Sequence, residues 1–211
     1  MSKKVDEVIS YLDEILPDAK CELIANKDYE FLICVMLSAQ TTDVSVNKVT
    51  PKLFERFRTL EESNNASIDE IKSYIHSLGL SYNKAKNVKG IASMLLKEYN
   101  GILPKEKNEL TRLPGVGIKT ANVVRAEIFH EQEFAVDTHV ARIAKRLGFA
   151  KDEDTVEEIE RKLRKQFPSN RYTKSHHQLI WFGRRYCSSK NPKCEECKLQ
   201  SYCKYYKKHS K

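Results

Sequence analysis

The strongest chemical pattern in the sequence is a glycine-rich segment that leads into a lysine, Leu113-Pro114-Gly115-Val116-Gly117-Ile118-Lys119-Thr120-Ala121. Two glycines separated by one residue let the backbone turn tightly and approach a partner closely. We predict a short helix over residues 105–112, ended by Pro114, and a second helix from Ile118 onward. The start of that second helix suits a phosphate, because its backbone N–H groups and positive dipole end are exposed. An ordinary tight turn between two helices is the alternative interpretation of so short a pattern.

A second informative segment is centred on an aspartate, Ala135-Val136-Asp137-Thr138-His139-Val140-Ala141-Arg142-Ile143. An Asp directly before an amphipathic helix is a good N-cap, and the sequence alone favours that role for Asp137. A carboxylate can also stabilise positive charge that develops on a substrate and assist a proton transfer. The two roles are compatible.

Four of the six cysteines lie close together near the C-terminus, at Cys187, Cys194, Cys197 and Cys203. In a reducing compartment such a group is typical of a metal site rather than of disulfides. Four thiolates suit an iron–sulfur cluster, and a structural zinc ion is the alternative. The two other cysteines, Cys21 and Cys34, fall outside the spacing, and we expect them to be buried apolar residues.

The charge of the 211-residue chain is +8 and is unevenly placed. Residues 187–211 contain seven Lys and two Glu and so carry +5, which favours nucleic acid, and then a membrane surface, as the partner. The longest apolar run, Phe31 to Leu37, is too short to span a bilayer, and residues 1–16 lack the apolar core of a signal peptide. We therefore expect a cytoplasmic protein, associated with the nucleoid and without a membrane partner.

The spacing of apolar residues is helical nearly everywhere, for example from Val5 to Leu16, from Val88 to Leu96 and from Ile159 to Phe167. No run shows the alternation of a β-strand, so the predicted fold class is all-α. Residues that favour turns divide the helices, at Pro17, Asn26, Pro51, Asn64–Asn65, Gly79, Asn100–Gly101, Pro114 to Gly117, Gly148 and Pro168. The sequence alone shows no domain boundary.

Together these motifs resemble the endonuclease III family of helix-hairpin-helix DNA glycosylases, from about Phe31 to Cys203. The resemblance implies a six-helix barrel domain over residues 22–131 and a second helical domain from residues 1–21 and 132–211. It implies a [4Fe–4S] cluster on the four clustered cysteines. It also implies a monomer that acts on double-stranded DNA with damaged bases or abasic sites. Lys119 and Asp137 would face each other across a cleft between the domains.

The resemblance also assigns chemistry to individual residues. Lys119 corresponds to the family's nucleophile and Asp137 to its catalytic carboxylate, with His139 as a support residue at the DNA interface. An amine nucleophile forms a Schiff base at the sugar C1′, and the strand is then cut by β-elimination. The attacking amine must be neutral, which a helix N-terminus and desolvation in a cleft both favour.

The expected DNA contacts come from several short segments. Gly115, Val116 and Gly117 would bind a phosphate, and Lys190 and Lys193 in the cysteine loop would contact others; a solvated loop is the alternative. The segment Leu37 to Lys48 and the turn Leu78-Gly79-Leu80 match family segments that enter the gap left by an extruded base, which assigns that role to Gln40 and Leu80. Taken alone, these two residues would be read as a polar helix end and a core leucine. Ile118 departs from the family, in which this position is often basic.

The resemblance predicts a base excision repair enzyme with both glycosylase and AP lyase activity, acting on oxidised pyrimidines. An adenine-removing glycosylase is the first alternative, but that branch lacks the lysine and carries a Glu in the segment equivalent to 31–40, where this chain has no acid. A helix-hairpin-helix module that binds DNA without catalysis is the second alternative. Such a module would need neither Lys119 nor Asp137.

Overall fold

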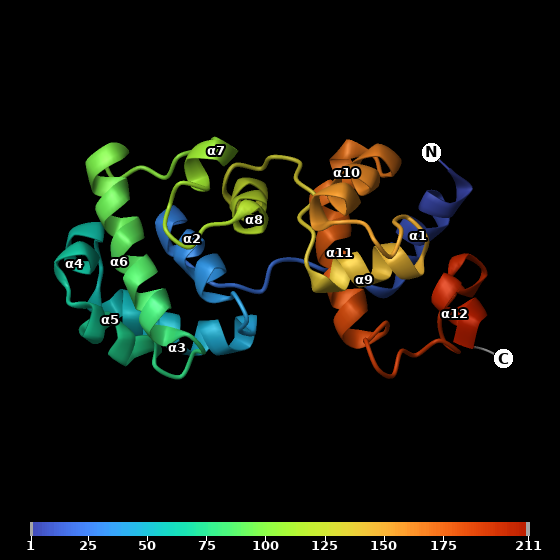
Figure 1. The fold of residues 1–211 in the computed structure, drawn as a ribbon, viewed down its shortest axis with the longest axis horizontal. Coiled ribbons are helices and arrows are strands. Elements are labelled where there is room, and N and C mark those ends of the chain that lie inside the picture. Colours follow the sequence, from blue (N-terminus) through green and yellow to red (C-terminus); the bar gives the residue numbers. More distant parts are fainter. Residues whose placement is uncertain (1, 210–211) are drawn as a thin grey trace. The chain divides into compact units, whose positions relative to one another are not determined.

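The structure is a computed structural model, and it describes residues 2–209. Over that range the chain folds into helices joined by turns and has no β-strand, which confirms the predicted all-α class. The chain divides into two compact units. The hairpin unit comprises residues 22–131, and the cysteine unit comprises residues 1–21 and 132–211 (Figure 1). No helix within 2–209 combines the length and the apolar character needed to cross a membrane.

The hairpin unit is built around α2, whose residues from Glu30 to Leu37 are all buried. This helix packs against α3, α6 and α8, so an apolar run without a polar face is what its position requires. The described part of the unit contains α2 (Asp28–Leu37), α3 (Asp43–Arg56), α4 (Leu60–Asn65), α5 (Ile68–Ile75), α6 (Ser81–Glu98), α7 (Lys107–Leu110) and α8 (Ile118–Ile128). It thus has one helical segment more than a six-helix barrel, and the shortest is the four-residue α7.

Side-chain caps begin three of these helices, since Thr42, Thr59 and Ser67 each accept a hydrogen bond from the backbone three residues later. One predicted helix boundary is wrong, because Pro51 lies inside α3 instead of ending a helix. A proline there costs a backbone hydrogen bond, but Val46 and Leu53 on either side of it are fully buried. Burial of the apolar face therefore outweighs the local preference of the proline.

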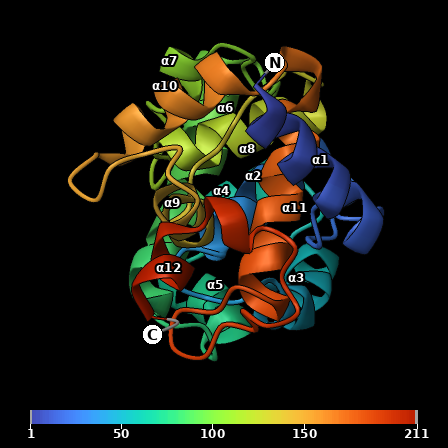
Figure 2. The same cartoon turned by 90° about the vertical axis from the view of Figure 1, so that its right-hand side faces the viewer.

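The cysteine unit combines the N-terminal helix with the C-terminal part of the chain. It contains α1 (Lys3–Ile15), α9 (Thr138–Arg146), α10 (Val156–Gln166), η1 (Ser169–Arg171), α11 (Tyr172–Arg185), η2 (Gln200–Tyr202) and α12 (Lys204–His209). Val5, Val8 and Leu12 of α1 enter a core that includes Leu179 and Phe182 of α11. Figure 2 looks onto this unit and shows α1 beside α11, with the loop that leads to α12.

A polar contact also joins α1 to α11. Asp13 Oδ1 accepts hydrogen bonds from Arg171, at 2.7 Å, and from Gln178, at 2.9 Å. Burial alone would raise the pKa of Asp13, but the hydrogen bonds from Arg171, Gln178 and Lys174 outweigh it and lower the pKa to about 2. The charged carboxylate therefore ties the N-terminal helix to a segment about 160 residues later in the chain.

The remaining predicted helices and the two isolated cysteines agree only in part with the structure. The periodic runs from Val5, Val88 and Ile159 are confirmed as parts of α1, α6 and α10. The helix expected over residues 105–112 is shorter, since α7 spans Lys107–Leu110 and turns follow it. Cys34 is buried as expected, whereas Cys21 is only half-buried.

Candidate functional site

The glycine-rich segment forms a tight hairpin between α7 and α8. Gly115 has a φ of +76°, and a Cβ on it would lie 2.3 Å from Nδ2 of Asn87 on α6. A Cβ on Gly90, also on α6, would lie 2.9 Å from Cγ of Pro114. Two glycines, one on each side of this contact, therefore let the hairpin lie directly on α6. Gly90 was not among the residues predicted from the sequence, although a glycine inside an apolar-periodic helix is a signal of close packing.

Gly117 is the N-cap of α8 and differs from Gly115 in its surroundings. Its φ is −93°, and a Cβ on it would meet nothing within 4 Å. Neither its conformation nor its neighbours inside the protein require glycine, so this side of the hairpin is open to a partner. Lys119, the second residue of α8, is exposed, as is Ile118. Val116 is buried, so its side chain is not available to a ligand.

The two residues expected to enter the DNA helix both have left-handed backbone conformations. Gln40 has a φ of +55° in the exposed turn after α2, and Leu80 has a φ of +60° as the N-cap of α6. The side chain of Leu80 is 57% exposed, so its interpretation as a core leucine is wrong. Such conformations are strained for residues with side chains and occur most often at functional positions.

Asp137 caps α9, as the sequence alone predicted. Its Oδ1 accepts a hydrogen bond from the backbone N–H of Val140 at 2.8 Å, which fixes the orientation of the carboxylate. His139, two residues later, is half-buried, and its Nδ1 lies 3.1 Å from Nη2 of Arg142. Since a guanidinium group only donates, Nδ1 is the acceptor, and neutral His139 carries its proton on Nε2. Burial lowers the pKa of His139, and the positive charges of Arg142 and Arg184 also lower it, whereas the negative charge of Asp137 raises it.

Arg142 connects the helix that follows Asp137 to the start of the cysteine loop. Its guanidinium group donates to the carbonyl of Gly183, at 2.9 Å, and to that of Cys187, at 3.0 Å. A Cβ on Gly183 would lie 2.9 Å from the Cβ of His139, so this glycine lets α9 and α11 approach closely. Neither Arg142 nor Gly183 was among the residues predicted from the sequence. The available signal was Gly183, because a glycine inside a helix indicates close packing.

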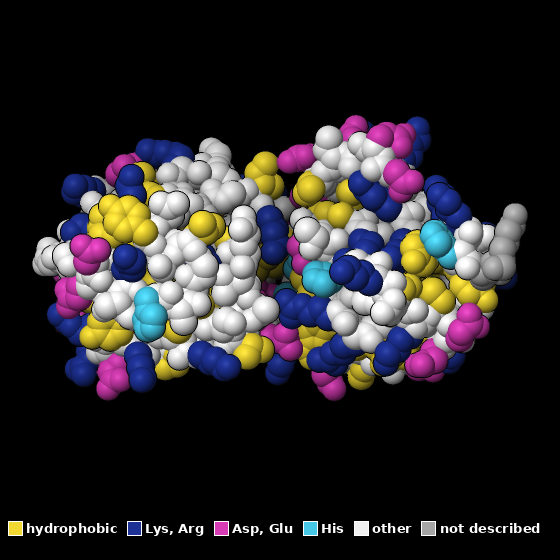
Figure 3. All heavy atoms as spheres, turned by 60° about the horizontal axis from the view of Figure 1, so that its bottom comes forward, with side chains coloured by type: hydrophobic (Ala, Val, Ile, Leu, Met, Phe, Trp, Pro, Cys, Tyr) yellow, Lys and Arg dark blue, Asp and Glu magenta, His cyan; other side chains and the backbone are white. Residues whose placement is uncertain are grey.

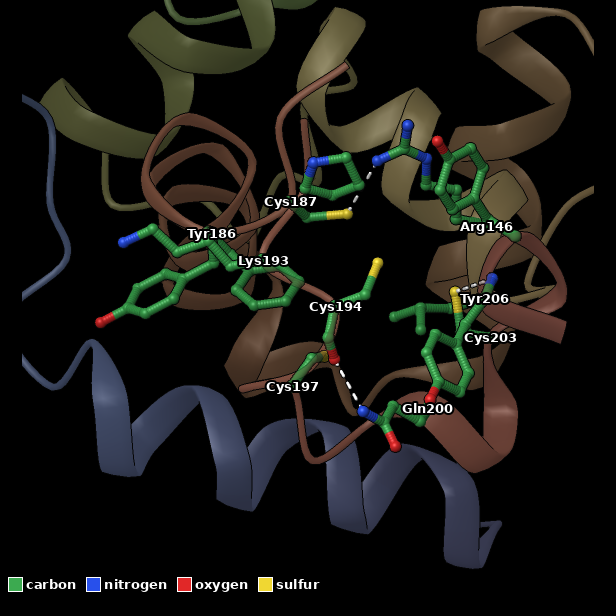
Figure 4. A pocket seen from close by; sticks show the side chains of 13 residues that line it. Arg146, Tyr186, Cys187, Lys193, Cys194, Cys197, Gln200, Cys203 and Tyr206 are labelled. Atoms are coloured by element: carbon green, nitrogen blue, oxygen red, sulfur yellow. Dashed lines mark hydrogen bonds between the residues drawn. The ribbon is translucent and has the colours of Figure 1, made fainter. Parts of the chain in front are cut away.

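The four clustered cysteines all line one cavity, with about 30 Å³ of space for the centres of water-sized molecules. In Figure 4 the sulfurs of Cys187, Cys194 and Cys203 point toward this common space. The wall is completed mainly by aromatic and aliphatic groups, which include Leu147, Phe182, Tyr186, Pro192, Tyr205 and Tyr206. Among the described residues no three His, Cys, Asp or Glu side chains are arranged to hold a single metal ion.

Three of the four sulfurs accept hydrogen bonds from N–H groups. Nη1 of Arg146 donates to Sγ of Cys187 at 3.2 Å, and the backbone N–H of Tyr206 donates to the sulfur of Cys203 (Figure 4). The backbone N–H of Leu199 donates to the sulfur of Cys197. Burial and the nearby sulfurs of Cys203 and Cys187 raise the pKa of the Cys194 thiol. A bound metal would stabilise the charged thiolate and so offset this effect of burial, because a coordinated thiol is deprotonated.

Arg146 also holds the first part of the cysteine loop. It donates to the carbonyls of Ser188, at 2.7 Å, and Ser189, at 3.0 Å, and its guanidinium group stacks on Tyr205. Lys190 and Lys193 follow in the same loop and are both exposed. On the face drawn in Figure 3, Lys and Arg side chains occur on both units and form a group on the cysteine unit.

Comparisons with known proteins agree on one family. The sequence profile of the HhH-GPD superfamily of base excision DNA repair proteins matches residues 33–169. Endonuclease III of Bacillus subtilis (strain 168) is 40% identical over 209 residues, which cover 99% of this chain and 95% of the relative. Endonuclease III of Escherichia coli (strain K12) is 40% identical over 202 residues, which cover 96% and 95% of the two chains.

A solved structure extends the likeness to three dimensions. A trapped endonuclease III–DNA covalent intermediate superimposes with a TM-score of 0.95 at 42% sequence identity, and the match covers 100% of both chains. The similarity in sequence and fold thus covers the hairpin, the Asp137 segment and the cysteine loop together. The chain therefore belongs to the endonuclease III family, the DNA glycosylases and AP lyases of base excision repair within the HhH-GPD superfamily.

Proposed function

We propose that the protein removes oxidised pyrimidines from double-stranded DNA and cuts the strand at the resulting abasic site, with Lys119 as the nucleophile. The observation that carries the proposal is the exposed Lys119 amine in the first turn of α8, directly after the open face of Gly117. The trapped covalent complex of the related endonuclease III with DNA supports this mechanism.

The reaction has two stages. In the first, the Lys119 nitrogen forms a bond to C1′ while the N-glycosidic bond breaks, and the base leaves with the bonding electrons and takes up a proton. Loss of a proton from nitrogen and opening of the sugar ring give the Schiff base. In the second, a base removes a proton from C2′, the C3′–O bond breaks, and the 3′ phosphate leaves. Water then releases the enzyme from the cut strand.

Asp137 supplies the negative charge in this proposal. Its carboxylate would stabilise the positive charge that develops on the sugar as the base leaves, and it would assist the proton transfers. The hydrogen bond from Val140 N–H supports this role, because it holds the carboxylate in one orientation. His139 would support the same surface as a neutral side chain, since burial lowers its pKa.

The DNA contacts are proposed from exposed features of both units. The backbone of residues 115–117 and the start of α8 would bind a phosphate, with the open space beside Gly117 admitting it. Gln40 and Leu80 would fill the gap left by the extruded nucleotide, and the exposed fraction of Leu80 supports this. Lys190 and Lys193 would each neutralise about one phosphate.

We propose further that Cys187, Cys194, Cys197 and Cys203 hold a [4Fe–4S] cluster. The residues present fit it, because the four cysteines line one cavity and three of their sulfurs accept N–H hydrogen bonds, as ligating thiolates do. The cluster would cross-link the loop at four points and hold Lys190 and Lys193 toward DNA. Such ligation requires no redox role.

The test of the proposal is borohydride trapping on duplexes that contain thymine glycol or an abasic site. Borohydride reduces a Schiff base to a stable amine, so only an enzyme with an amine nucleophile gives a covalent product. We expect the wild type to be trapped and Lys119→Gln to lose both trapping and strand cleavage. DNA affinity should fall only modestly, because one charge is part of a larger electrostatic footprint.

The matched control is Lys52→Gln, which removes one exposed lysine of α3 in the same unit. It should be trapped like the wild type. Trapping of Lys119→Gln at the wild-type level would assign the nucleophile elsewhere. A wild type that binds DNA but neither traps nor cuts would favour a binding module without catalysis.

A further inference from the structure

Lys84 of α6 is a buried lysine that the proposed reaction does not use. The residue is 4% exposed, whereas lysines normally keep their charge in water. Burial lowers the pKa of its amine. Within residues 2–209 the side chain forms no ion pair with a carboxylate, and its Nζ donates a hydrogen bond of 2.6 Å to Oγ1 of Thr41. Burying an amine with a neutral partner is costly, so a specific role must offset that cost.

The contact with Thr41 holds the turn that carries Gln40. The Thr41 hydroxyl accepts from Lys84 and donates to the carbonyl of Ala39, while the Thr41 N–H donates to the carbonyl of Ser38 at 3.0 Å. Ala39 and Thr41 are the two neighbours of Gln40, whose φ is +55°. The Lys84 side chain therefore supports a strained backbone conformation from both sides.

The backbone of Lys84 holds the second turn. Its N–H donates to the carbonyl of Leu80 at 3.0 Å, which closes the first turn of α6 after the left-handed conformation of Leu80. Farther along the same helix, Asn87 and Gly90 contact Gly115 and Pro114 of the hairpin. One helix thus carries the Leu80 turn and contacts both the Gln40 turn and the hairpin, and the side chain of Lys84 makes the contact with the Gln40 turn.

We propose that Lys84 is a positioning residue that holds the Gln40 and Leu80 turns as one rigid unit, so that both side chains enter the DNA helix together. The inference rests on the proposed function, in which these two side chains fill the gap left by the extruded nucleotide. Two independently mobile turns would each lose conformational freedom on insertion, whereas a preorganised pair has lost it already. The buried lysine increases the rate of base extrusion at a cost in fold stability.

The experiment compares Lys84→Met, which keeps the length of the side chain and removes the charge and the donor, with Thr41→Val, which removes the hydroxyl that accepts from Lys84 and donates to Ala39. Thr41→Ser is the conservative control, because it retains the hydroxyl. The double variant Lys84→Met/Thr41→Val completes a mutant cycle. Gln40→Ala and Leu80→Ala serve as references for the loss of the inserted side chains themselves.

Three quantities are measured on each full-length variant. They are the single-turnover rate of thymine glycol excision, the rate of cleavage at a preformed abasic site, and the fluorescence of 2-aminopurine next to the lesion, which reports unstacking. We expect Lys84→Met to lower excision about tenfold to hundredfold, as for loss of a charged hydrogen bond. The fluorescence rise should be reduced in parallel. Abasic-site cleavage should change less than about threefold, because no base has to be extruded.

Fold stability separates positioning from a structural role. The thermal midpoint of Lys84→Met should equal or exceed that of the wild type, since a buried charge is replaced by an apolar group. Thr41→Val should lower excision similarly, Thr41→Ser should restore it, and the double variant should be no worse than Lys84→Met. Wild-type excision in Lys84→Met and Thr41→Val, additive effects in the cycle, or a loss of abasic-site cleavage equal to that of excision would each overturn the inference.

The reference variants show which proposal has failed. Gln40→Ala and Leu80→Ala could reduce excision and fluorescence while Lys84→Met and Thr41→Val do not. That result would support the proposed insertion and reject the role of Lys84. If the two reference variants behave like the wild type, the proposed insertion is wrong and the inference built on it falls with it.

Discussion

The hairpin and the cysteine loop are both proposed to bind DNA phosphates, but their shapes have different origins. The hairpin is shaped by its own backbone, with Gly115 in a left-handed conformation and packed directly on α6. The cysteine loop is held from outside, by Arg142 and Arg146 of α9, which donate to its carbonyls and to Sγ of Cys187. The backbone conformation of the first element is therefore set within a few residues, whereas the second depends on a distant helix and on the cluster that its cysteines are proposed to hold.

The largest expected effect tests whether α9 contributes chemistry as well as support. Asp137→Asn keeps the cap, because Asn is also a good N-cap, but it removes the negative charge. Excision of thymine glycol in single-turnover assays should fall by about two to three orders of magnitude, as for loss of a group that stabilises charge in the transition state. The thermal midpoint and the DNA affinity should stay near those of the wild type. Near-normal excision would reduce Asp137 to a cap.

The next effect tests whether the loop depends on a bound cluster. Purified wild-type protein should be yellow-brown, with a broad absorbance at about 400 nm and about four irons per chain. Cys194→Ser should lose most of the iron, and DNA affinity should fall because the loop is no longer fixed. Cys34→Ser, outside the cavity, is the control and should keep its iron. One zinc and no iron per chain in the wild type would refute the cluster.

A smaller effect separates the two glycines of the hairpin. Gly115→Ala should destabilise the fold by about 1–3 kcal/mol, since its Cβ would collide with Asn87 and its φ is left-handed. Gly117→Ala should change stability by less than about 1 kcal/mol, because its Cβ meets open space and only a cap is weakened. It should nevertheless weaken DNA binding several-fold in titrations at fixed salt. Unchanged affinity would mean that no phosphate approaches Gly117.

The smallest effect concerns the charges of the loop. Replacing both Lys190 and Lys193 with Gln should weaken binding about equally on damaged and undamaged duplexes, because phosphate contacts carry no sequence information. The slope of log affinity against log salt should decrease in magnitude by about 1.8 for two lost contacts. Iron content should not change, since neither lysine is a ligand. An unchanged salt slope would show that the loop faces solvent.

Local patterns in the sequence were sufficient for much of the fold. The periodic runs of α1, α6 and α10 and the N-cap at Asp137 follow from residues within one or two helical turns, and the structure confirms them. Pro51 shows the limit of this reasoning, because the burial of α3 overrides the preference of a single residue. The same limit explains Leu80, whose apolar type predicts burial although it is exposed.

The residues that the sequence did not reveal act through tertiary contacts. Arg142 and Arg146 reach carbonyls more than 40 residues away, and Lys84 reaches Thr41 in another turn of the same unit. Arginine and lysine on a helix are solvated in most proteins, so their types give no indication of such contacts. Gly90 and Gly183 likewise matter only because another helix or hairpin lies against them.

The division of the chain into one continuous and one discontinuous unit has a consequence for synthesis on the ribosome. Residues 22–131 can complete their core as soon as they emerge, whereas α1 has to wait for α11, about 160 residues later. At ribosomal elongation rates this interval is on the order of ten seconds. Throughout it, Val5, Val8 and Leu12 lack the core that finally covers them. The apolar face of the nascent N-terminal helix is therefore a surface that a chaperone could cover during this interval.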